Sequence, residues 1–102
     1  MPEFVKVASK TELDGQSPIC VEVGGKRIAL FDLDGEIYAI DDVCTHEGGP
    51  LSEGLVENDE VECPWHGARF KIATGEVCRA PAYENVVRYN VRVSGDDVEV
   101  EV

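Results

Sequence analysis

The 102-residue sequence is poor in basic side chains and has no long uncharged run. Nine Lys and Arg stand against 21 Asp and Glu, so the formal net charge is −12. This sign is opposite to that of proteins that bind nucleic acids or anionic membranes. The longest stretch without a charged residue, 15–21, has seven residues, whereas a membrane-spanning helix needs about 20. We therefore expect no nucleic-acid partner and no membrane span, and partners that are basic or neutral.

The sequence also lacks an export signal and a disulfide scaffold. Its N-terminal segment carries charges throughout, without an apolar core or a twin-arginine pair, which indicates a cytoplasmic protein. Four cysteines are too few for a secreted disulfide framework of this length. In a reducing compartment, cysteines clustered with histidines indicate a metal site before a disulfide. The length fits a single domain, 1–102.

Short apolar runs separated by turn dipeptides predict an all-β fold. Strands are expected at 4–7, at 19–23 and 28–33 around Gly24-Gly25, and at 36–40 after Asp34-Gly35. At the C-terminal end, valines alternate with charged residues over 87–93 and again over 98–102, which predicts a closing hairpin with one solvated face. The spacing of Ser9 and Glu12 is that of a capping box and permits one helical turn.

Residues 43–82 differ from both strand-rich ends. They hold three of the five prolines, five of the ten glycines and both histidines of the chain. We interpret them as loops and short strands inserted into a β scaffold, because functional sites usually lie on loops that a rigid sheet supports.

The chemistry of this segment lies in two Cys and two His. Cys44-Thr45-His46 is followed, after sixteen residues, by Cys63-Pro64-Trp65-His66. Tetrahedral zinc accepts two Cys and two His. A Rieske-type [2Fe-2S] cluster uses two Cys on one iron and two His on the other. The residues alone leave both chemistries open.

The flanking residues resemble the Rieske ferredoxin family. The segments CTHEGGPLSEG and CPWHGARF match the two cluster loops of that family, and the likeness continues through FKIATGEV and the loop around Pro81 into both β ends. The resemblance implies a Rieske-type antiparallel β-sandwich with an inserted cluster-binding subdomain, at about 43–82. It also implies one [2Fe-2S] cluster per chain. Cys44 and Cys63 would bind one iron through sulfur, and His46 and His66 would bind the other through Nδ1.

Departures from the family pattern predict a low reduction potential. High-potential members carry an extra Cys in each cluster loop, joined as a disulfide, and Ser and Tyr hydroxyls that donate to cluster sulfurs. In this sequence, Trp65 occupies the position of the extra Cys in the second loop. The stretch 47–50 of the first loop contains no Cys either. Ala68 and Phe70 stand at the hydroxyl positions. We therefore expect a value at the low end of the Rieske range, roughly −150 to +300 mV.

The resemblance implies a monomeric electron carrier rather than an enzyme. It would accept one electron from an NAD(P)H-dependent flavoprotein reductase and pass it to the Rieske centre of a terminal non-heme iron oxygenase, as in the degradation of aromatic compounds. The sequence has no nucleotide fingerprint and no further His for a mononuclear iron site. Two alternatives remain: a redox subunit bound tightly to an enzyme, and a zinc-stabilised interaction module.

For the remaining candidate residues we expect ordinary structural roles. Cys20 and Cys78 lie in apolar runs and are expected to be small buried thiols, as free Cys often is. Trp65 either shields the cluster or simply packs. The acidic stretches 57–62 and 41–42 are expected to be solvated, and their closeness to the cluster loops makes a docking role the alternative.

Overall fold

The computed structural model describes residues 3–13, 18–33, 35–43, 49–65, 67–79 and 84–101. These residues are mostly strands in antiparallel sheets, so the all-β prediction is confirmed. In chain order the elements are β1 (Phe4–Ser9), α1 (Lys10–Leu13), β2 (Ile19–Val23), β3 (Lys26–Leu33), β4 (Glu36–Asp41), the 3₁₀ turn η1 (Leu51–Glu53), β5 (Leu55–Glu57), β6 (Glu60–Glu62), β7 (Arg69–Lys71), β8 (Val77–Arg79), β9 (Arg88–Tyr89), β10 (Val91–Ser94) and β11 (Asp97–Glu101).

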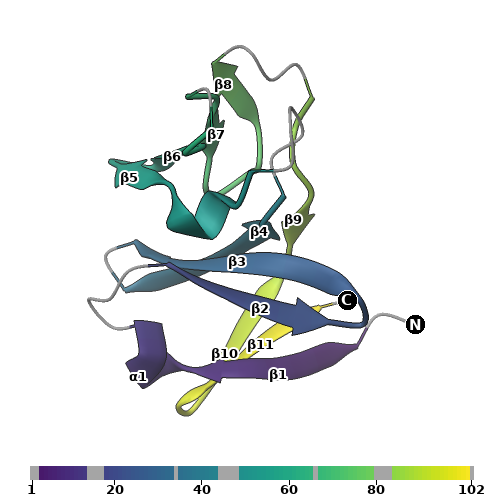
Figure 1. Ribbon diagram of the computed structural model, residues 1–102. Helices are drawn as coiled ribbons and strands as arrows, with labels where there is room; N and C mark the ends of the chain where they lie inside the picture. Colours follow the sequence, from purple (N-terminus) through teal and green to yellow (C-terminus); the bar gives the residue numbers. More distant parts are fainter. Residues whose placement is uncertain are drawn as a thin grey trace.

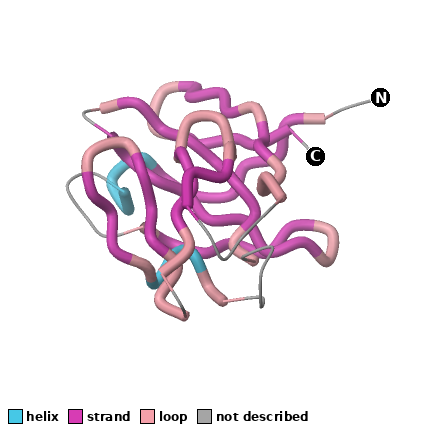
Figure 2. The backbone as a smooth tube through the Cα atoms, turned by 90° about the horizontal axis from the view of Figure 1, so that it is seen from above, coloured by secondary structure: helices cyan, strands magenta, loops and turns pink. Residues whose placement is uncertain are grey.

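The strands form three sheets stacked as layers (Figure 1). The first sheet has the order β1-β11-β10, the second β2-β3-β4-β9 and the third β5-β6-β7-β8. The second sheet is the middle layer, and the view from above in Figure 2 shows the strands crossing over one another. The first two sheets make the predicted sandwich, and the third sheet covers the other face of the second.

Strand β3 is the centre of the core because it is buried on both faces. Its residues Ile28, Ala29, Leu30 and Phe31 expose at most 1% of their surface. Successive strand side chains point to opposite faces. Ile28 and Leu30 accordingly pack with Val98 of the first sheet, whereas Ala29 and Phe31 belong to the core beneath the third sheet. An uninterrupted apolar run is the pattern expected of a strand covered on both sides.

The predicted hairpins and helical turn are confirmed. Gly24 and Gly25 form the turn between β2 and β3 with φ of 55° and 82°, a conformation that favours glycine. Strands β3 and β4 pair from Ile28 with Asp41 to Leu33 with Glu36. At the start of α1 the Ser9 N–H donates to Glu12 Oε2 at 3.3 Å, one half of a capping box.

The single strand expected over 87–93 is wrong, because the chain changes sheets there. Residues 88–89 form β9 beside β4, and residues 91–94 form β10 beside β11. Asn90 lies at the break, where its carbonyl accepts from the Glu101 N–H at 2.9 Å. The split leaves Val87 and Val93 exposed, at 54% and 42%, although the alternation placed both on the inner face.

The third sheet lies between β4 and β9 in the chain, and those two strands are neighbours in the second sheet. The Asp41 N–H donates to the Val87 carbonyl at 2.9 Å, next to the pairing of Ile40 with Arg88. The segment between them therefore leaves and returns to the scaffold at one place. Within the described residues, no helix has the length and apolar character needed to span a bilayer.

Candidate metal centre

The first predicted cluster loop is closed at its base by backbone pairing. Val43 and Pro50 form an antiparallel bridge, and the Leu51 N–H donates to the Asp42 carbonyl at 2.7 Å. These contacts bring the two ends of the loop together immediately after β4. Cys44 and His46, the predicted ligands of this loop, lie outside the described residues.

The second loop connects β6 and β7 and is closed in the same way. The Cys63 N–H donates to the Ala68 carbonyl at 2.7 Å. Gly67 has φ of 75°, which a residue with a side chain adopts only with strain. Cys63 is 2% exposed and packs in the core that continues down to β3. His66, the other predicted ligand of this loop, lies outside the described residues.

The two loops touch at Gly49. A Cβ atom on Gly49 would lie 2.7 Å from the sulfur of Cys63 and 3.1 Å from ring atoms of Trp65. Real side chains do not approach one another this closely, so the contact requires glycine. The indole ring of Trp65 packs over the space that this glycine leaves, and the residue remains 48% exposed. Trp65 therefore packs and stays at the surface, and it joins the two loops without a covalent bond.

This geometry fits the predicted metal site. A buried thiol lies at the closed end of one loop, and the other loop reaches that sulfur through a residue without a side chain. Among the described residues, no group of three or more Cys, His, Asp or Glu is gathered as a metal site would require. Cys63 is the one predicted ligand within that part of the chain, so the ligand set stays a prediction.

The two positions that lack a hydroxyl group are both interior. Ala68 and Phe70 have no exposed surface and belong to the same core cluster as Cys63. Neither side chain can donate a hydrogen bond that would stabilise added negative charge on a nearby sulfur. Pro81, whose loop is part of the family resemblance, lies outside the described residues.

Asp42 lies at the base of the first predicted cluster loop, and the sequence did not predict its burial. It was expected in a solvated acidic stretch, but it has no exposed surface. Its Oδ1 accepts from the Ser52 N–H at 2.7 Å, and its Oδ2 lies 3.4 Å from Nη2 of Arg27. Neighbouring Asp41 is half-buried and accepts from the Tyr89 hydroxyl at 2.6 Å. The hydrogen-bond partners that hold these carboxylates lie on other elements, Ser52 on η1 and Tyr89 on β9, and no local sequence pattern encodes them.

The expectation that Cys20 and Cys78 are buried is wrong, since both are exposed. Each lies on a strand at the edge of its sheet, β2 or β8, where no described strand pairs with one side of the backbone. Partial desolvation of the sulfur raises the pKa of both thiols, and the Arg27 guanidinium partly opposes this at Cys20. A raised pKa disfavours the thiolate that binds metals or attacks electrophiles.

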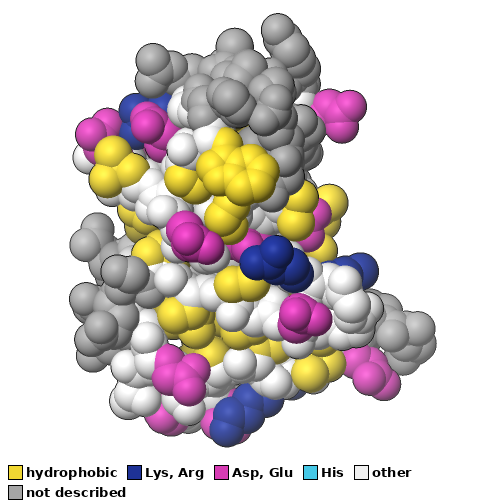
Figure 3. Space-filling model, in the orientation of Figure 1, with side chains coloured by type: hydrophobic (Ala, Val, Ile, Leu, Met, Phe, Trp, Pro, Cys, Tyr) yellow, Lys and Arg dark blue, Asp and Glu magenta, His cyan; other side chains and the backbone are white. Residues whose placement is uncertain are grey.

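The acidic stretch 57–62 forms the β5–β6 hairpin. Asn58 turns the chain with φ of 57°, and Asp59 beside it is exposed. Arg69 of β7 pairs with Glu57 at 3.0 Å and with Glu60 at 3.4 Å. Figure 3 shows acidic and apolar side chains together on the upper half of the molecule, where the third sheet lies. The expected solvation holds for the hairpin tip, while Val61 points inward.

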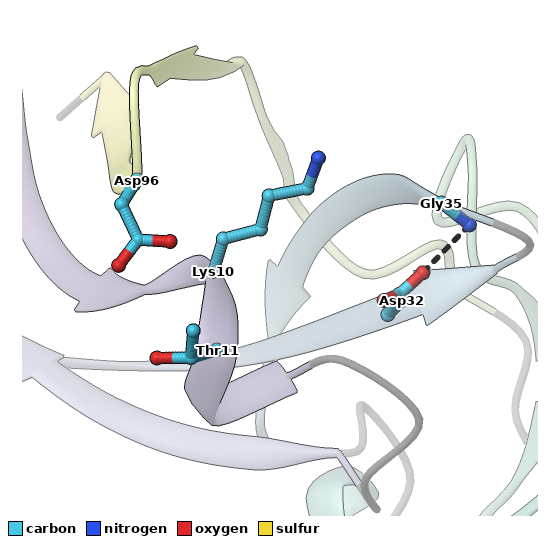
Figure 4. Close-up of a pocket in the computed structure, with 5 residues that line it drawn as sticks. All are labelled: Lys10, Thr11, Asp32, Gly35 and Asp96. Carbon is cyan, nitrogen blue, oxygen red and sulfur yellow. Dashed lines mark hydrogen bonds between the residues drawn. The ribbon is translucent and has the colours of Figure 1, made fainter.

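A pocket of about 270 Å³ lies at the opposite end of the molecule, beside α1 (Figure 4). The side chain of Lys10 extends between Asp96 and the β3–β4 turn. In that turn, the Gly35 N–H donates to Asp32 Oδ1 at 2.8 Å. The pocket shares no residue with either predicted cluster loop.

Three comparisons place the chain among known proteins. Residues 3–90 match the family described as Rieske [2Fe-2S] domain. The ferredoxin component of a naphthalene 1,2-dioxygenase system from Pseudomonas aeruginosa is 42% identical over 100 residues, which cover 98% of this chain and 96% of the relative.

Solved structures agree with the sequence comparison. The ferredoxin of carbazole 1,9a-dioxygenase from Nocardioides aromaticivorans IC177 superposes with a TM-score of 0.90 at 30% identity and covers 95% of both chains. A complex of reduced oxygenase and oxidised ferredoxin in carbazole 1,9a-dioxygenase contains a chain with a TM-score of 0.88 at 31% identity, covering 95% of this chain and 91% of that one.

Proposed function

This chain belongs to the Rieske [2Fe-2S] family, and we propose that it carries single electrons from an NAD(P)H-dependent flavoprotein reductase to a terminal Rieske non-heme iron oxygenase. It is an electron carrier of the ferredoxin type rather than an enzyme. The observation that carries the proposal is the buried Cys63 thiol, with the first loop held against it at Gly49. The chain around it matches a ferredoxin component over 98% of its length.

We propose Cys44, His46, Cys63 and His66 as the ligands of one cluster per chain, within a subdomain at about 43–82. Two thiolates and two imidazoles are the donor set of a Rieske centre. When bound, the cluster supplies reversible one-electron transfer. The chain's own contribution is to close both loops with backbone hydrogen bonds and to keep water from the Cys63 sulfur.

The same residues suit electron transfer over short distances. The apolar packing of Ala68 and Phe70 beside Cys63 keeps the interior dry, while the half-exposed Trp65 lies on the surface of the second loop. A site held by two fastened loops changes its geometry little when its charge changes, which favours rapid exchange. The matching ferredoxin in a complex with its oxygenase supports an oxygenase as the acceptor. We infer aromatic compounds as the substrates of that oxygenase, and a cytoplasmic monomer as the working form.

Spectroscopy of the purified protein tests the cofactor. We expect a red-brown protein whose absorption bleaches with dithionite, and a rhombic EPR signal of nitrogen-ligated [2Fe-2S] in the reduced state. Iron and sulfide analysis should give two of each per chain, as one such cluster contains. A colourless protein with one zinc per chain would reject the proposal. If the protein elutes together with a large enzyme during purification, and not as a small monomer, it is not a free electron carrier.

Single substitutions test the ligand set. His46→Ala and His66→Ala should each abolish the cluster and destabilise the fold, because no further His exists to replace the ligand and metal binding is coupled to folding. Cys20→Ser and Cys78→Ser are matched controls that remove exposed thiols outside the ligand set, and they should keep full iron content. Full iron and an unchanged spectrum in either His variant would show that the assignment is wrong.

A further inference from the structure

Asp42 is the buried charged side chain of the described part of the molecule. It has no exposed surface, and it lies directly between β4 and the first predicted cluster loop. Removing a carboxylate from water costs several kcal/mol unless other groups compensate. A charge kept in such a place therefore needs an explanation in the contacts that it makes.

The contacts of Asp42 hold both ends of the loop. Its N–H donates to the Arg27 carbonyl of β3 at 3.0 Å, and its own carbonyl accepts from the Leu51 N–H at 2.7 Å. Its Oδ1 accepts from the Ser52 N–H at 2.7 Å. One residue thus ties the strand before the loop to the turn after it, which explains its position.

The second carboxylate oxygen shows that the charge is only partly compensated. Oδ2 is buried and makes no hydrogen bond of ordinary geometry with the described residues. Nη2 of Arg27 lies 3.4 Å from it, and the Cys20 thiol also faces the carboxylate. Arg27 is 52% exposed, so water screens the cation much more than the carboxylate. Glu22 and the Cys20 thiol also face this guanidinium. The pair therefore places net negative charge on the interior side, at the loop base.

We propose that Asp42 lowers the reduction potential of the cluster and that Arg27 opposes it, so that the pair sets the working potential. This inference rests on the proposed function. Asp42 is two residues from Cys44, which limits the separation of their Cα atoms to about 7 Å. Reduction adds one negative charge to the cluster, and fixed negative charge so close disfavours that step.

Two substitutions with opposite expected signs test the proposal. Asp42→Asn keeps the side-chain shape and the Oδ1 acceptor but removes the charge. It should favour reduction by about threefold to tenfold, which is a rise of about 30 to 60 mV at 59 mV per tenfold. Arg27→Gln keeps the backbone carbonyl contact, removes the screening cation and should lower the potential by a smaller amount. Arg27→Lys should restore most of the original value.

A remote ion pair supplies matched controls. Arg92 of β10 donates to Glu99 of β11 at 2.8 Å, in the sheet farthest from the cluster loops. Glu99→Gln and Arg92→Gln change the net charge by the same amounts and should move the potential by less than a third as much. Potentials are measured by direct electrochemistry, with EPR to confirm an intact Rieske spectrum.

The outcomes separate this inference from the proposed function. Opposite shifts at Asp42 and Arg27 with small shifts at the controls support it. Equal shifts at Asp42 and Glu99, or shifts of the same sign at Asp42 and Arg27, overturn it while leaving the carrier function intact. If Asp42→Asn does not retain its cluster, the Arg27 variants test the inference. A lower potential in Arg27→Gln that Arg27→Lys largely restores supports it, and an unchanged potential in Arg27→Gln overturns it. A wild-type protein without a Rieske spectrum would reject the proposed function itself.

Discussion

At Gly49 a missing side chain lets the first loop reach the sulfur of Cys63. We expect Gly49→Ala to lower the free energy of unfolding by about 1 to 3 kcal/mol, the usual cost of overpacking a tight contact. The added methyl group would displace the Cys63 sulfur, from which it would lie 2.7 Å, or the Trp65 ring at 3.1 Å. The cluster content and the EPR spectrum should change with the stability.

Gly95→Ala is the control for Gly49→Ala. Gly95 lies in the β10–β11 turn, and a Cβ there would meet nothing within 4 Å. Its positive φ of 62° imposes a small backbone cost, but the cluster spectrum should stay that of the wild type. If Gly49→Ala had the spectrum, iron content and stability of the wild type, the close approach of the two loops would be wrong.

Ala68 offers a second test at the residue scale. Ala68→Ser places a hydroxyl group in the core beside Cys63, where it can donate to a cluster sulfur. Such a bond strengthens on reduction, and a difference of about 1 kcal/mol between the two oxidation states raises the potential by about 40 mV. Phe70→Tyr should act in the same direction if the edge of its ring faces the cluster. The measurement is direct electrochemistry of the variants and the wild type at one fixed pH.

The control for Ala68→Ser is Ala39→Ser, which also buries a hydroxyl group. Ala39 is 1% exposed and lies in the other core, between the first and second sheets. Ala39→Ser should lower the free energy of unfolding without changing the reduction potential of the cluster. If the potential of Ala68→Ser is unchanged or lowered while the cluster is intact, the lack of a hydroxyl donor is not the cause of a low potential. Nearby charges such as that of Asp42 would then be the remaining explanation.

Among the elements, β9 is the shortest described strand, and a side-chain hydrogen bond adds to its pairing with β4. It pairs with β4 over two residues, Tyr89 with Ala39 and Arg88 with Ile40. The Tyr89 hydroxyl adds a hydrogen bond to the Asp41 carboxylate at 2.6 Å. Tyr89→Phe should therefore lower the free energy of unfolding at neutral pH by about 1 to 2 kcal/mol, the range for a partly exposed bond to a charged acceptor.

The pH dependence of stability gives this prediction a second readout. Partial burial, together with the bond to Asp41 and its charge, raises the pKa of Tyr89 above its ordinary value of 10. A group with a raised folded pKa contributes stability that is complete below the unfolded pKa and is lost as the pH rises towards the folded one. Unfolding by urea from pH 8 to 11 should show a loss of stability above pH 10. Tyr89→Phe should lack this loss, and the control Tyr38→Phe, on the neighbouring strand β4, should retain it.

For the whole molecule, the net charge of −12 should govern encounter with partners. Attraction to a basic docking surface is screened over a Debye length of about 8 Å at 0.15 M salt. The second-order rate of reduction by the reductase should fall roughly tenfold as the ionic strength rises from about 0.02 M to about 0.5 M. A rate that is independent of salt would mean that docking is mainly apolar.

Two charge variants show whether the partner is attracted by charges near the cluster loops or by the net charge of the whole molecule. Asp59→Asn removes an exposed charge from the β5–β6 hairpin, and Asp96→Asn removes one from the far β10–β11 turn. If docking uses the end of the molecule that carries the cluster loops, Asp59→Asn should reduce the rate more. Equal effects would indicate steering by net charge alone.

Much of the fold was predictable because its signals are local. The turn at Gly24-Gly25, the run from Ile28 to Phe31 and the capping pair at the start of α1 all depend on residues near one another in the chain. Regular alternation over 87–93 concealed the change of sheet at Asn90, since periodicity does not indicate which sheet a residue joins.

By itself the sequence determined the all-β class, the acidic surface and the family, since strand patterns, charge and ligand spacing are written in consecutive residues. Only the tertiary structure decided that Cys20 and Cys78 lie on exposed strand edges and that Asp42 is buried. It also decided that Gly49 lies against Cys63. The physical reason is that burial and contact between distant segments depend on which strands become neighbours, and the same short apolar or acidic run suits an interior or an edge equally well.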